Sequence, residues 1–379
     1  MSKIKDIYVN GIGVITAAGS SVYENIHMLA SGESSLARTY RFPTELDVPV
    51  GESELSDIDL KKSLGISEEQ VISRTALLGL HAVMEALTGL SFSGKKIALI
   101  SGTSVGGMDL SEIFWKLYRA DLAQGDVQFV KMHDPGAVTS MMAQYLKGKG
   151  LDIKFVSTVS TACSAAGNAI MLGARMLRAG MFDIVIAGGT DALCRFTLDG
   201  FNSLRILDHE ICRPFSESRA GLNLGEGAGY LVLSTSSNDA LCRLSGWGNA
   251  NEAYHQTAST PEGVGPGMAM SAALKNSGLV PSEISFVNTH GTGTQVNDAA
   301  EFNAMKRIFG DNLPPYTSLK SYFGHTLGAS EGIEAALVCR ALSDGNCSFM
   351  GADVMNPKNI MSSAFGFSGN CVSLVFSRL

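Results

Sequence analysis

Short apolar runs alternate with amphipathic or alanine-rich stretches along the whole chain. The clearest apolar runs occupy residues 97–100, 184–187, 230–233 and 372–376. Glycines or polar residues bound these runs, which is typical of buried β-strands. Small and straight-chain residues dominate 164–179, and Gly180 follows as a stop signal, which predicts a helix that ends there. Strand-like runs that alternate with helical segments predict an α/β fold.

The second half of the chain repeats features of the first half. Gly11-Ile12-Gly13 recurs as Gly246-Trp247-Gly248, and the run 97–100 has a counterpart in 284–288. Four positions recur with identical spacing, namely Gly167, Arg175, Leu177 and Gly180 as Gly332, Arg340, Leu342 and Gly345. Such a repeat predicts two duplicated α/β halves, 1–236 and 237–379, that meet near the polar stretch 234–240. Chance similarity between two glycine-rich halves is the alternative.

Composition narrows the class of protein. The 379 residues are 45% hydrophobic and 17% charged, with a net charge of −7, which is typical of a globular protein of more than one domain. Basic runs interleaved with aromatics are absent, so we expect no nucleic-acid binding. Without a run of roughly 20 apolar residues, no membrane span is expected. Seven cysteines without a CxxC pair predict reduced thiols in the cytoplasm.

Cys163 is the first candidate for chemistry. It follows a strand-like segment that starts near Val156, and it directly precedes the predicted helix 164–179. Free N–H groups and the dipole at a helix N-terminus favour an anion, so we expect this thiol to ionise more readily than a free cysteine. A cysteine taken alone is more often a core residue. Its position favours a nucleophile.

Two histidines occupy constrained motifs. His290 ends an apolar strand within the glycine-rich stretch 288–294, which is where α/β folds place functional groups. His325 lies five residues after Lys320 and just before the helix that duplicates the Cys163 helix. An isolated histidine is more often structural, but two in such motifs favour a catalytic role.

These residues resemble the β-ketoacyl-acyl-carrier-protein synthases, which are condensing enzymes of the thiolase-like superfamily. The similar motifs are Thr161-Ala-Cys-Ser164, residues 213–229, the His290 motif with Asp298 and Glu301, Lys320 with Gly324-His325, and residues 365–369. They follow the family's order over nearly the whole chain. The resemblance implies a thiolase-like α/β fold whose two halves form a five-layered αβαβα core.

The resemblance also implies an elongation-type activity. Cys163 would hold an acyl group, and His290 and His325 would assist decarboxylative Claisen condensation with malonyl-acyl-carrier protein. The product would be 3-oxoacyl-acyl-carrier protein in fatty-acid, polyene or polyketide biosynthesis. Backbone N–H groups of Cys163 and Phe367 would form the oxyanion hole. No metal or cofactor is expected beyond the phosphopantetheine of the carrier protein.

Supporting roles follow from the same resemblance. Lys320 would pair with Glu301 and orient the histidines, and the alternative is an ordinary surface cation. Asp298 and Glu301 could equally be N-terminal charges on a helix that starts near Ala299. The remaining candidates are Thr292 and Thr294 for the pantetheine arm, Phe201 and Phe365 for the substrate pocket, Phe367 as a gate, and Arg205 for carrier-protein docking. Turn chemistry, core packing and a solvated arginine are the respective alternatives.

The chain departs from the family in two ways. Ser368-Gly-Asn-Cys371 stands in place of the usual Gly-Gly-Thr-Asn, which leaves the gate's behaviour open. Segments 38–73 and 121–136 are short, which favours a specialised pathway such as polyene or pigment synthesis.

Alternative functions follow from the same motifs. They are a non-catalytic chain-length or interaction subunit, an initiating synthase, and a thiolase that uses Cys371 as a second cysteine. We expect a homodimer or a heterodimer with a related synthase.

Overall fold

The computed structural model describes residues 5–379, so residues 1–4 of the predicted first half lie outside the described residues. The strands are β1 (Ile7–Ile15), β2 (Ile97–Gly102), β3 (Ile153–Val159), β4 (Ile184–Asp191), β5 (Gly227–Ser234), β6 (Cys242–Asn251), β7 (Phe286–Asn288), β8 (Tyr316–Thr317), β9 (Asn359–Phe365) and β10 (Asn370–Ser377). The helices are α1 (Val22–Ser31), α2 (Asp57–Leu64), α3 (Arg74–Ala86), α4 (Met108–Ala120), α5 (Pro135–Gly148), α6 (Ala165–Arg178), α7 (Arg195–Ser203), α8 (Val264–Ser277), α9 (Gln295–Phe309), α10 (Lys320–Phe323) and α11 (Ser330–Asp344).

The strand order repeats between the two halves. The strands form one sheet in the order β3-β2-β4-β5-β1-β6-β10-β9-β7-β8. When β6 to β10 are numbered from one to five, the second half has the same 3-2-4-5-1 order as the first half. In both halves the last strand is antiparallel to its neighbours and the three strands before it are parallel. The expected duplication of an α/β unit is therefore present in the backbone.

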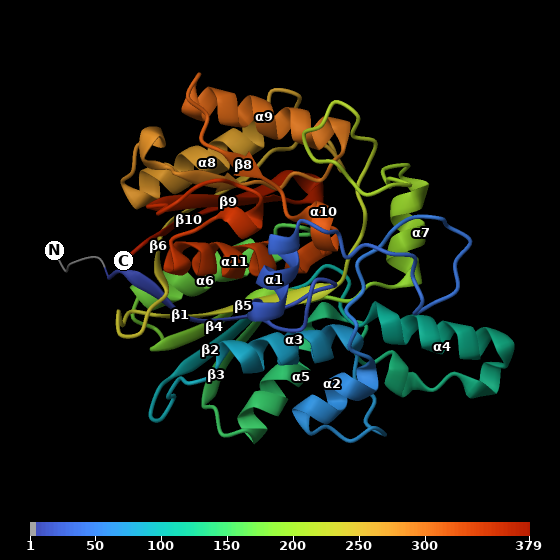
Figure 1. Ribbon diagram of the computed structural model, residues 1–379. Helices are drawn as coiled ribbons and strands as arrows, with labels where there is room; N and C mark the ends of the chain where they lie inside the picture. The colour runs from blue at the N-terminus through green and yellow to red at the C-terminus, as the bar shows by residue number, and fades with distance from the viewer. Residues whose placement is uncertain (1–4) are drawn as a thin grey trace.

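The helices lie in three layers around the two halves of the sheet (Figure 1). Helix α3 packs on β1 and β5, and α5 packs on β3. On the opposite side of the molecule, α8 packs on β6 and β10, with α9 against α8. Helices α6 and α11 contact each other and strands of both halves, so they form the central layer. This arrangement confirms the expected αβαβα core.

Glycines in the two first strands allow the outer helices to pack closely. A Cβ atom on Gly13 of β1 would lie 2.0 Å from the carbonyl oxygen of Ala82 in α3. A Cβ atom on Gly248 of β6 would lie 2.1 Å from the carbonyl oxygen of Ala269 in α8. Because no side chain fits at either distance, the repeated glycine motif records the same strand-helix contact in each half.

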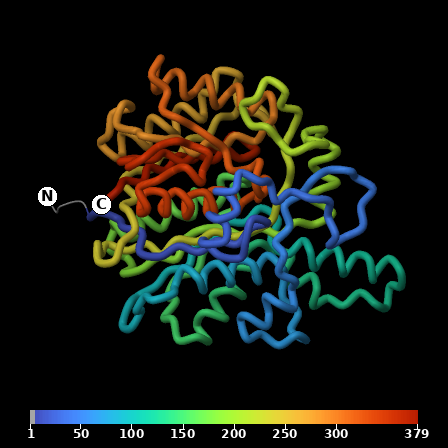
Figure 2. Tube along the Cα trace, in the orientation of Figure 1, coloured from blue at the N-terminus to red at the C-terminus, as the bar shows by residue number. Residues whose placement is uncertain are grey.

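Helix α4 and the turns that follow it form a limb outside the layered core (Figure 2). Leu110 is the one buried residue of this helix, whereas Ile113 and Trp115 are exposed. No helix within residues 5–379 is both long enough and apolar enough to span a membrane.

Candidate active site

Cys163 lies on a sharp turn between β3 and α6. Ala162 has a φ of 51°, in the left-handed region that few non-glycine residues adopt. Helix α6 begins two residues after the cysteine, with Ser164 as its N-cap residue. The predicted position at a helix N-terminus is therefore confirmed. Strained backbone of this kind is often found at functional sites.

Predicted residues from both halves line one pocket of about 370 Å³. It is lined by Cys163, His290, His325, Thr292, Thr294, Phe365, Phe367 and Arg205, among others. Phe201 of α7 is not among the lining residues, but its ring stacks on Phe367 with centroids 5.7 Å apart. The hydroxyl groups of Thr292 and Thr294 are hydrogen-bonded to each other at 2.9 Å.

The expectation of a readily ionised thiol is wrong. Burial raises the pKa of Cys163 to about 12, and the Asp191 carboxylate acts in the same direction. Lys320 and the backbone N–H groups of Cys163 and Phe367 lower this pKa, but less than burial raises it. The sequence shows the helix terminus but not the loss of water around the sulfur. Burial therefore favours the neutral thiol, toward which the backbone N–H groups of Cys163 and Phe367 are directed.

Glu301 holds the loop that carries His290. Its carboxylate accepts hydrogen bonds from the backbone N–H groups of His290 and Gly291, both at 2.8 Å. Burial raises the pKa of Glu301 to about 8. Asp298 accepts from the backbone N–H groups of Phe215 at 2.8 Å and Gly293 at 3.2 Å. Helix α9 begins at Gln295, earlier than expected, and both acids brace the loop before it.

The hydrogen bonds of His325 fix its neutral tautomer. Its Nδ1 atom accepts from the backbone N–H of Leu327 at 3.3 Å and lies 2.9 Å from the Ser330 hydroxyl. Because an N–H group points at Nδ1, the proton of the neutral ring belongs on Nε2. The ring therefore presents an N–H donor at its other edge.

The two histidine rings lie together in the pocket wall. Their centroids are 5.2 Å apart and the rings are nearly perpendicular, at 85°. Burial and the charge of Lys320 hold the pKa values of both rings well below the ordinary value. Within residues 5–379, no group hydrogen-bonds to His290 Nδ1. The pocket thus contains two neutral imidazoles beside a cysteine.

The predicted partner of Lys320 is wrong. Lys320 Nζ lies 2.6 Å from Glu334 Oε1, and both side chains are completely buried. Glu301 is occupied by the backbone of the His290 loop instead. Glu334 was missed from the sequence, although an acid next to the apolar run 335–339 is a signal for a buried partner. Asn288 also donates to Glu334, at 3.2 Å.

Asp191 at the end of β4 was also missed. Its buried carboxylate accepts from the Thr103 hydroxyl at 2.5 Å and from the N–H groups of Ser104 and Gly328. Burial raises its pKa to about 6. Since Gly328 lies three residues after His325, Asp191 fixes the turn that leads from the histidine into α11.

The loop with the unusual 368–371 sequence is hydrogen-bonded to the start of α6, the helix that follows Cys163. Asn370 Oδ1 accepts from Ser164 Oγ at 2.8 Å and from Asn168 Nδ2 at 2.7 Å. Ser368 has a φ of 68°, so a non-glycine residue occupies a left-handed turn here. Phe365, at the start of this loop, makes an edge contact with His290 at 5.5 Å. No cluster of His, Cys, Asp or Glu side chains in residues 5–379 is arranged to hold a metal ion.

The duplicated fold and this pocket together define a condensing enzyme of the thiolase-like class. Residues 5–239 match the family described as "Beta-ketoacyl synthase, N-terminal domain". Residues 241–348 match "Beta-ketoacyl synthase, C-terminal domain". The chain therefore belongs to the β-ketoacyl synthase family, which confirms the resemblance in its motifs.

Similar proteins cover the whole chain. It is 28% identical to 3-oxoacyl-[acyl-carrier-protein] synthase 2 of Staphylococcus aureus (strain COL), over 100% of this chain and 99% of the relative. Among solved structures, "The ishigamide ketosynthase/chain length factor" matches with a TM-score of 0.90 and 25% identity over 100% of both chains. A ketosynthase (ApeO) in complex with its chain length factor (ApeC) from Xenorhabdus doucetiae matches with a TM-score of 0.84 and 28% identity, over 100% of this chain and 99% of that chain.

Proposed function

We propose that this protein catalyses decarboxylative Claisen condensation between an acyl group on Cys163 and malonyl-acyl-carrier protein. One observation supports the proposal: a cysteine whose sulfur faces two backbone N–H groups lines the same pocket as two neutral histidines. Such a set supplies a nucleophile for the acyl group and N–H donors for a second thioester oxygen.

The first step is transfer of the acyl group to the enzyme. Cys163 Sγ attacks the acyl thioester carbonyl, and the N–H groups of Cys163 and Phe367 stabilise the oxyanion. A new C–S bond to the enzyme forms while the C–S bond to phosphopantetheine breaks. The proton of the Cys163 thiol leaves with the pantetheine thiol, so the transfer is balanced without a redox partner.

The second step forms the carbon-carbon bond. Loss of carbon dioxide from the malonyl group leaves its electron pair in an enolate, whose oxygen receives N–H bonds from His290 and from His325 Nε2. Because burial keeps both rings neutral, each can donate without a positive charge that would trap the malonyl carboxylate. The enolate carbon attacks the acyl carbonyl on Cys163, and the thiolate leaves and is then protonated. We propose that no cofactor is needed beyond phosphopantetheine.

The non-catalytic and thiolase alternatives fit the site less well. A chain-length subunit has no use for a nucleophile at the strained turn of Ala162, with N–H groups pointed at the sulfur. Cys371 is fully buried beside Glu252 and is not among the residues that line the pocket, so it is badly placed as a second catalytic cysteine.

We further propose two kinds of partner. Arg205 is exposed and also lines the pocket, which suits contact with an acidic carrier protein that delivers a pantetheine arm. Strand β3 is one of the two outer strands of the sheet, and Phe155, Val156 and Val159 on it are half-buried. An open edge of this kind favours pairing with a second chain of the same fold. The ApeO-ApeC complex supports a heterodimer, and co-purification with mass measurement in solution distinguishes it from a homodimer. A monomer would contradict both.

Mass spectrometry tests the activity. Incubation with an acyl-carrier-protein thioester should add one acyl group to Cys163, and malonyl-carrier protein should then remove it as ketoacyl product. Cys163→Ala should abolish both signals, whereas Cys194→Ala, a change at a buried cysteine outside the pocket, should retain them. His325→Ala and His290→Ala should retain acylation and lose decarboxylation. A folded wild-type protein that is never acylated at Cys163 overturns the proposal.

A further inference from the structure

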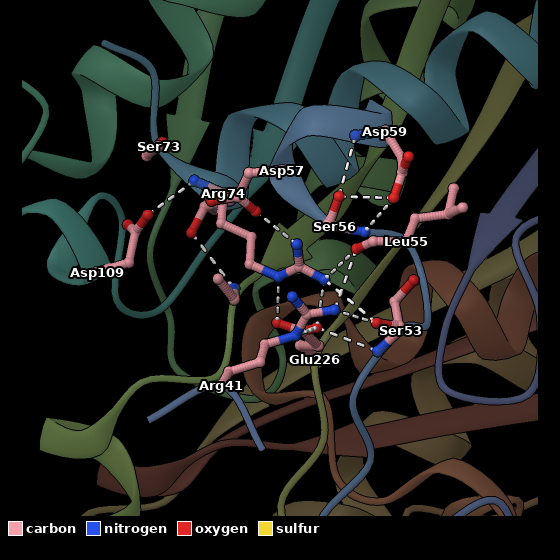
Figure 3. Close-up of polar contacts among 12 residues, drawn as sticks. Arg41, Ser53, Leu55, Ser56, Asp57, Asp59, Ser73, Arg74, Asp109 and Glu226 are labelled. Carbon is pink, nitrogen blue, oxygen red and sulfur yellow. Dashed lines mark hydrogen bonds and ion pairs between the residues drawn. The ribbon is translucent and has the colours of Figure 1, made fainter. Parts of the chain in front are cut away.

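A second cluster of buried charge lies outside the pocket, around Glu226 (Figure 3). Arg74 donates to both carboxylate oxygens of Glu226, through Nε at 2.8 Å and Nη2 at 2.7 Å. Arg41 lies 3.3 Å away, and the backbone N–H groups of Ser53 and Leu193 also donate to the carboxylate. Glu226 is completely buried, so this is an ion pair of fixed geometry rather than a solvated one.

The cluster joins the starts of helices α2, α3 and α4 to Glu226, which lies much later in the chain. Arg74 is the first residue of α3, and its Nη1 atom lies 2.6 Å from Asp57 at the start of α2. Its backbone N–H donates to Asp109 in the first turn of α4 at 2.7 Å. Burial raises the pKa of Asp109 to about 7. Figure 3 shows Arg74 between these two acids and Glu226.

Two backbone hydrogen bonds connect the residues just before Glu226 to His325. The N–H of Gly225 donates to the carbonyl of His325 at 2.9 Å, and the N–H of His325 donates to the carbonyl of Asn223 at 2.7 Å. On the other side of this segment, the N–H of Glu226 donates to the carbonyl of Gly51 at 2.9 Å. Segment 223–226 therefore lies between the Gly51 segment and the histidine.

The packing around this segment leaves no room for adjustment. A Cβ atom on Gly225 would lie 2.2 Å from the carbonyl oxygen of Phe323, and one on Gly51 would lie 2.1 Å from the same oxygen. The Gly51 segment, segment 223–226 and residues 323–325 are in backbone contact. A shift of Glu226 therefore moves the segments on both sides of it. His325 is held at its N–H and its carbonyl by that chain.

We propose that Glu226, clamped by Arg74, is a positioning residue that aims the Nε2–H group of His325 at the malonyl thioester oxygen. Glu226 itself is not among the residues that line the pocket, and it acts through Gly225 and Asn223. The inference rests on the proposed function of His325 as an N–H donor. Donors of this kind lose much of their effect when they are displaced by about 1 Å.

Two variants test the proposal through separate half-reactions. Glu226→Gln removes the charge but keeps the size of the side chain, and Arg74→Lys keeps the charge but cannot bind both oxygens. The rate of decarboxylation of malonyl-carrier protein, measured as carbon dioxide release, should fall on the order of 10- to 100-fold in Glu226→Gln. Arg74→Lys should give a smaller loss, and it carries the test if Glu226→Gln does not fold. The rate of acylation of Cys163, measured by mass spectrometry, should stay close to the wild-type rate in both variants.

The pH profile adds a readout that a purely structural role does not move. Burial holds the pKa of His325 low, so a displaced and better hydrated ring takes up a proton at higher pH. The acid limb, which is the low-pH side of the pH–rate profile for decarboxylation, should therefore move to higher pH in both variants. Arg38→Lys is the matched control, because Arg38 pairs with Asp47 at an exposed site in the same part of the chain. It should leave both half-reactions and the acid limb unchanged.

His325→Ala distinguishes a failure of the proposed function of His325 from a failure of the positioning role of Glu226. If His325→Ala retains decarboxylation, the proposed function of His325 fails. If His325→Ala loses it while folded Glu226→Gln and Arg74→Lys keep wild-type decarboxylation and an unmoved acid limb, the positioning role is wrong. An equal loss of acylation and decarboxylation in the two variants also overturns it, because it indicates general disruption of the pocket.

Discussion

Removal of the positive charge of Lys320 or of the negative charge of Glu334 should destabilise the protein by a similar amount. The two changes should affect catalysis differently. Lys320 Nζ and Glu334 Oε1 are 2.6 Å apart, and both side chains are completely buried. Loss of one member leaves the other charge buried without its partner, which costs about 3–5 kcal/mol of unfolding free energy. We expect Lys320→Met and Glu334→Gln each to lose this amount in chemical denaturation.

The pH dependence of decarboxylation should distinguish the two variants. The charge of Lys320 lowers the pKa values of His290 and His325, because a nearby cation disfavours a protonated ring. Without that charge in Lys320→Met, the rings take up protons at higher pH. Activity should therefore fall sooner as the pH is lowered, and the acid limb should move up. Glu334→Gln keeps the cation beside the rings, so its acid limb should not move up.

Two controls complete the experiment. Lys306→Met removes an exposed lysine on α9 and should change the unfolding free energy by less than about 0.5 kcal/mol. The double variant Lys320→Met/Glu334→Leu should recover most of the stability, because apolar residues often replace a buried ion pair without loss. Its acid limb should stay shifted. A loss of less than about 1 kcal/mol in both single variants, as for a surface pair, would refute the energetic argument. An upward shift in both would refute the electrostatic one.

Three further predictions concern other parts of the site. Asn370→Ala removes an acceptor shared by the Ser164 and Asn168 side chains, which keep their hydrogen bonds to Thr161, and should cost about 0.5–1.5 kcal/mol in thermal unfolding, with slower acylation; unchanged stability would show that the loop is not held there. Arg205→Glu should raise KM for carrier-protein substrates but not for free pantetheine thioesters, and an equal effect on both would exclude a docking role. Cys371→Ala should retain condensation, whereas its loss would favour the thiolase alternative.

Much of the architecture could be predicted because close packing leaves a signal in the sequence. Gly13 and Gly248 are repeated because a carbonyl of the outer helix in each half approaches the first strand of that half in the same way. The positions of Cys163, His290 and His325 could likewise be predicted because each follows a local motif at the end of a strand or the start of a helix. These signals depend on neighbours in the chain.

The errors concern contacts between segments that the sequence does not place together. Lys320 was assigned to Glu301, but the turn from α10 into α11 places its ammonium against Glu334. The pKa of Cys163 was expected to fall, but burial by residues from both halves raises it. Glu226 lies in the motif 213–229, but that motif does not reveal its partners Arg41 and Arg74, which are more than a hundred residues away. Partner choice and desolvation are properties of the packed structure.

The duplication explains how one pocket holds both a nucleophile and a proton-bearing imidazole. Ala162 and Leu327 occupy equivalent places in the repeat, five residues before Gly167 and Gly332, and both have left-handed backbones, with φ of 51° and 53°. Each turn frees backbone N–H groups just before a central helix. In the first half the N–H of Cys163 itself is directed at its own sulfur, where negative charge would develop. In the second half the N–H of Leu327 faces His325 Nδ1, which places the ring proton on Nε2. The same backbone device thus stabilises charge in one half and sets a tautomer in the other.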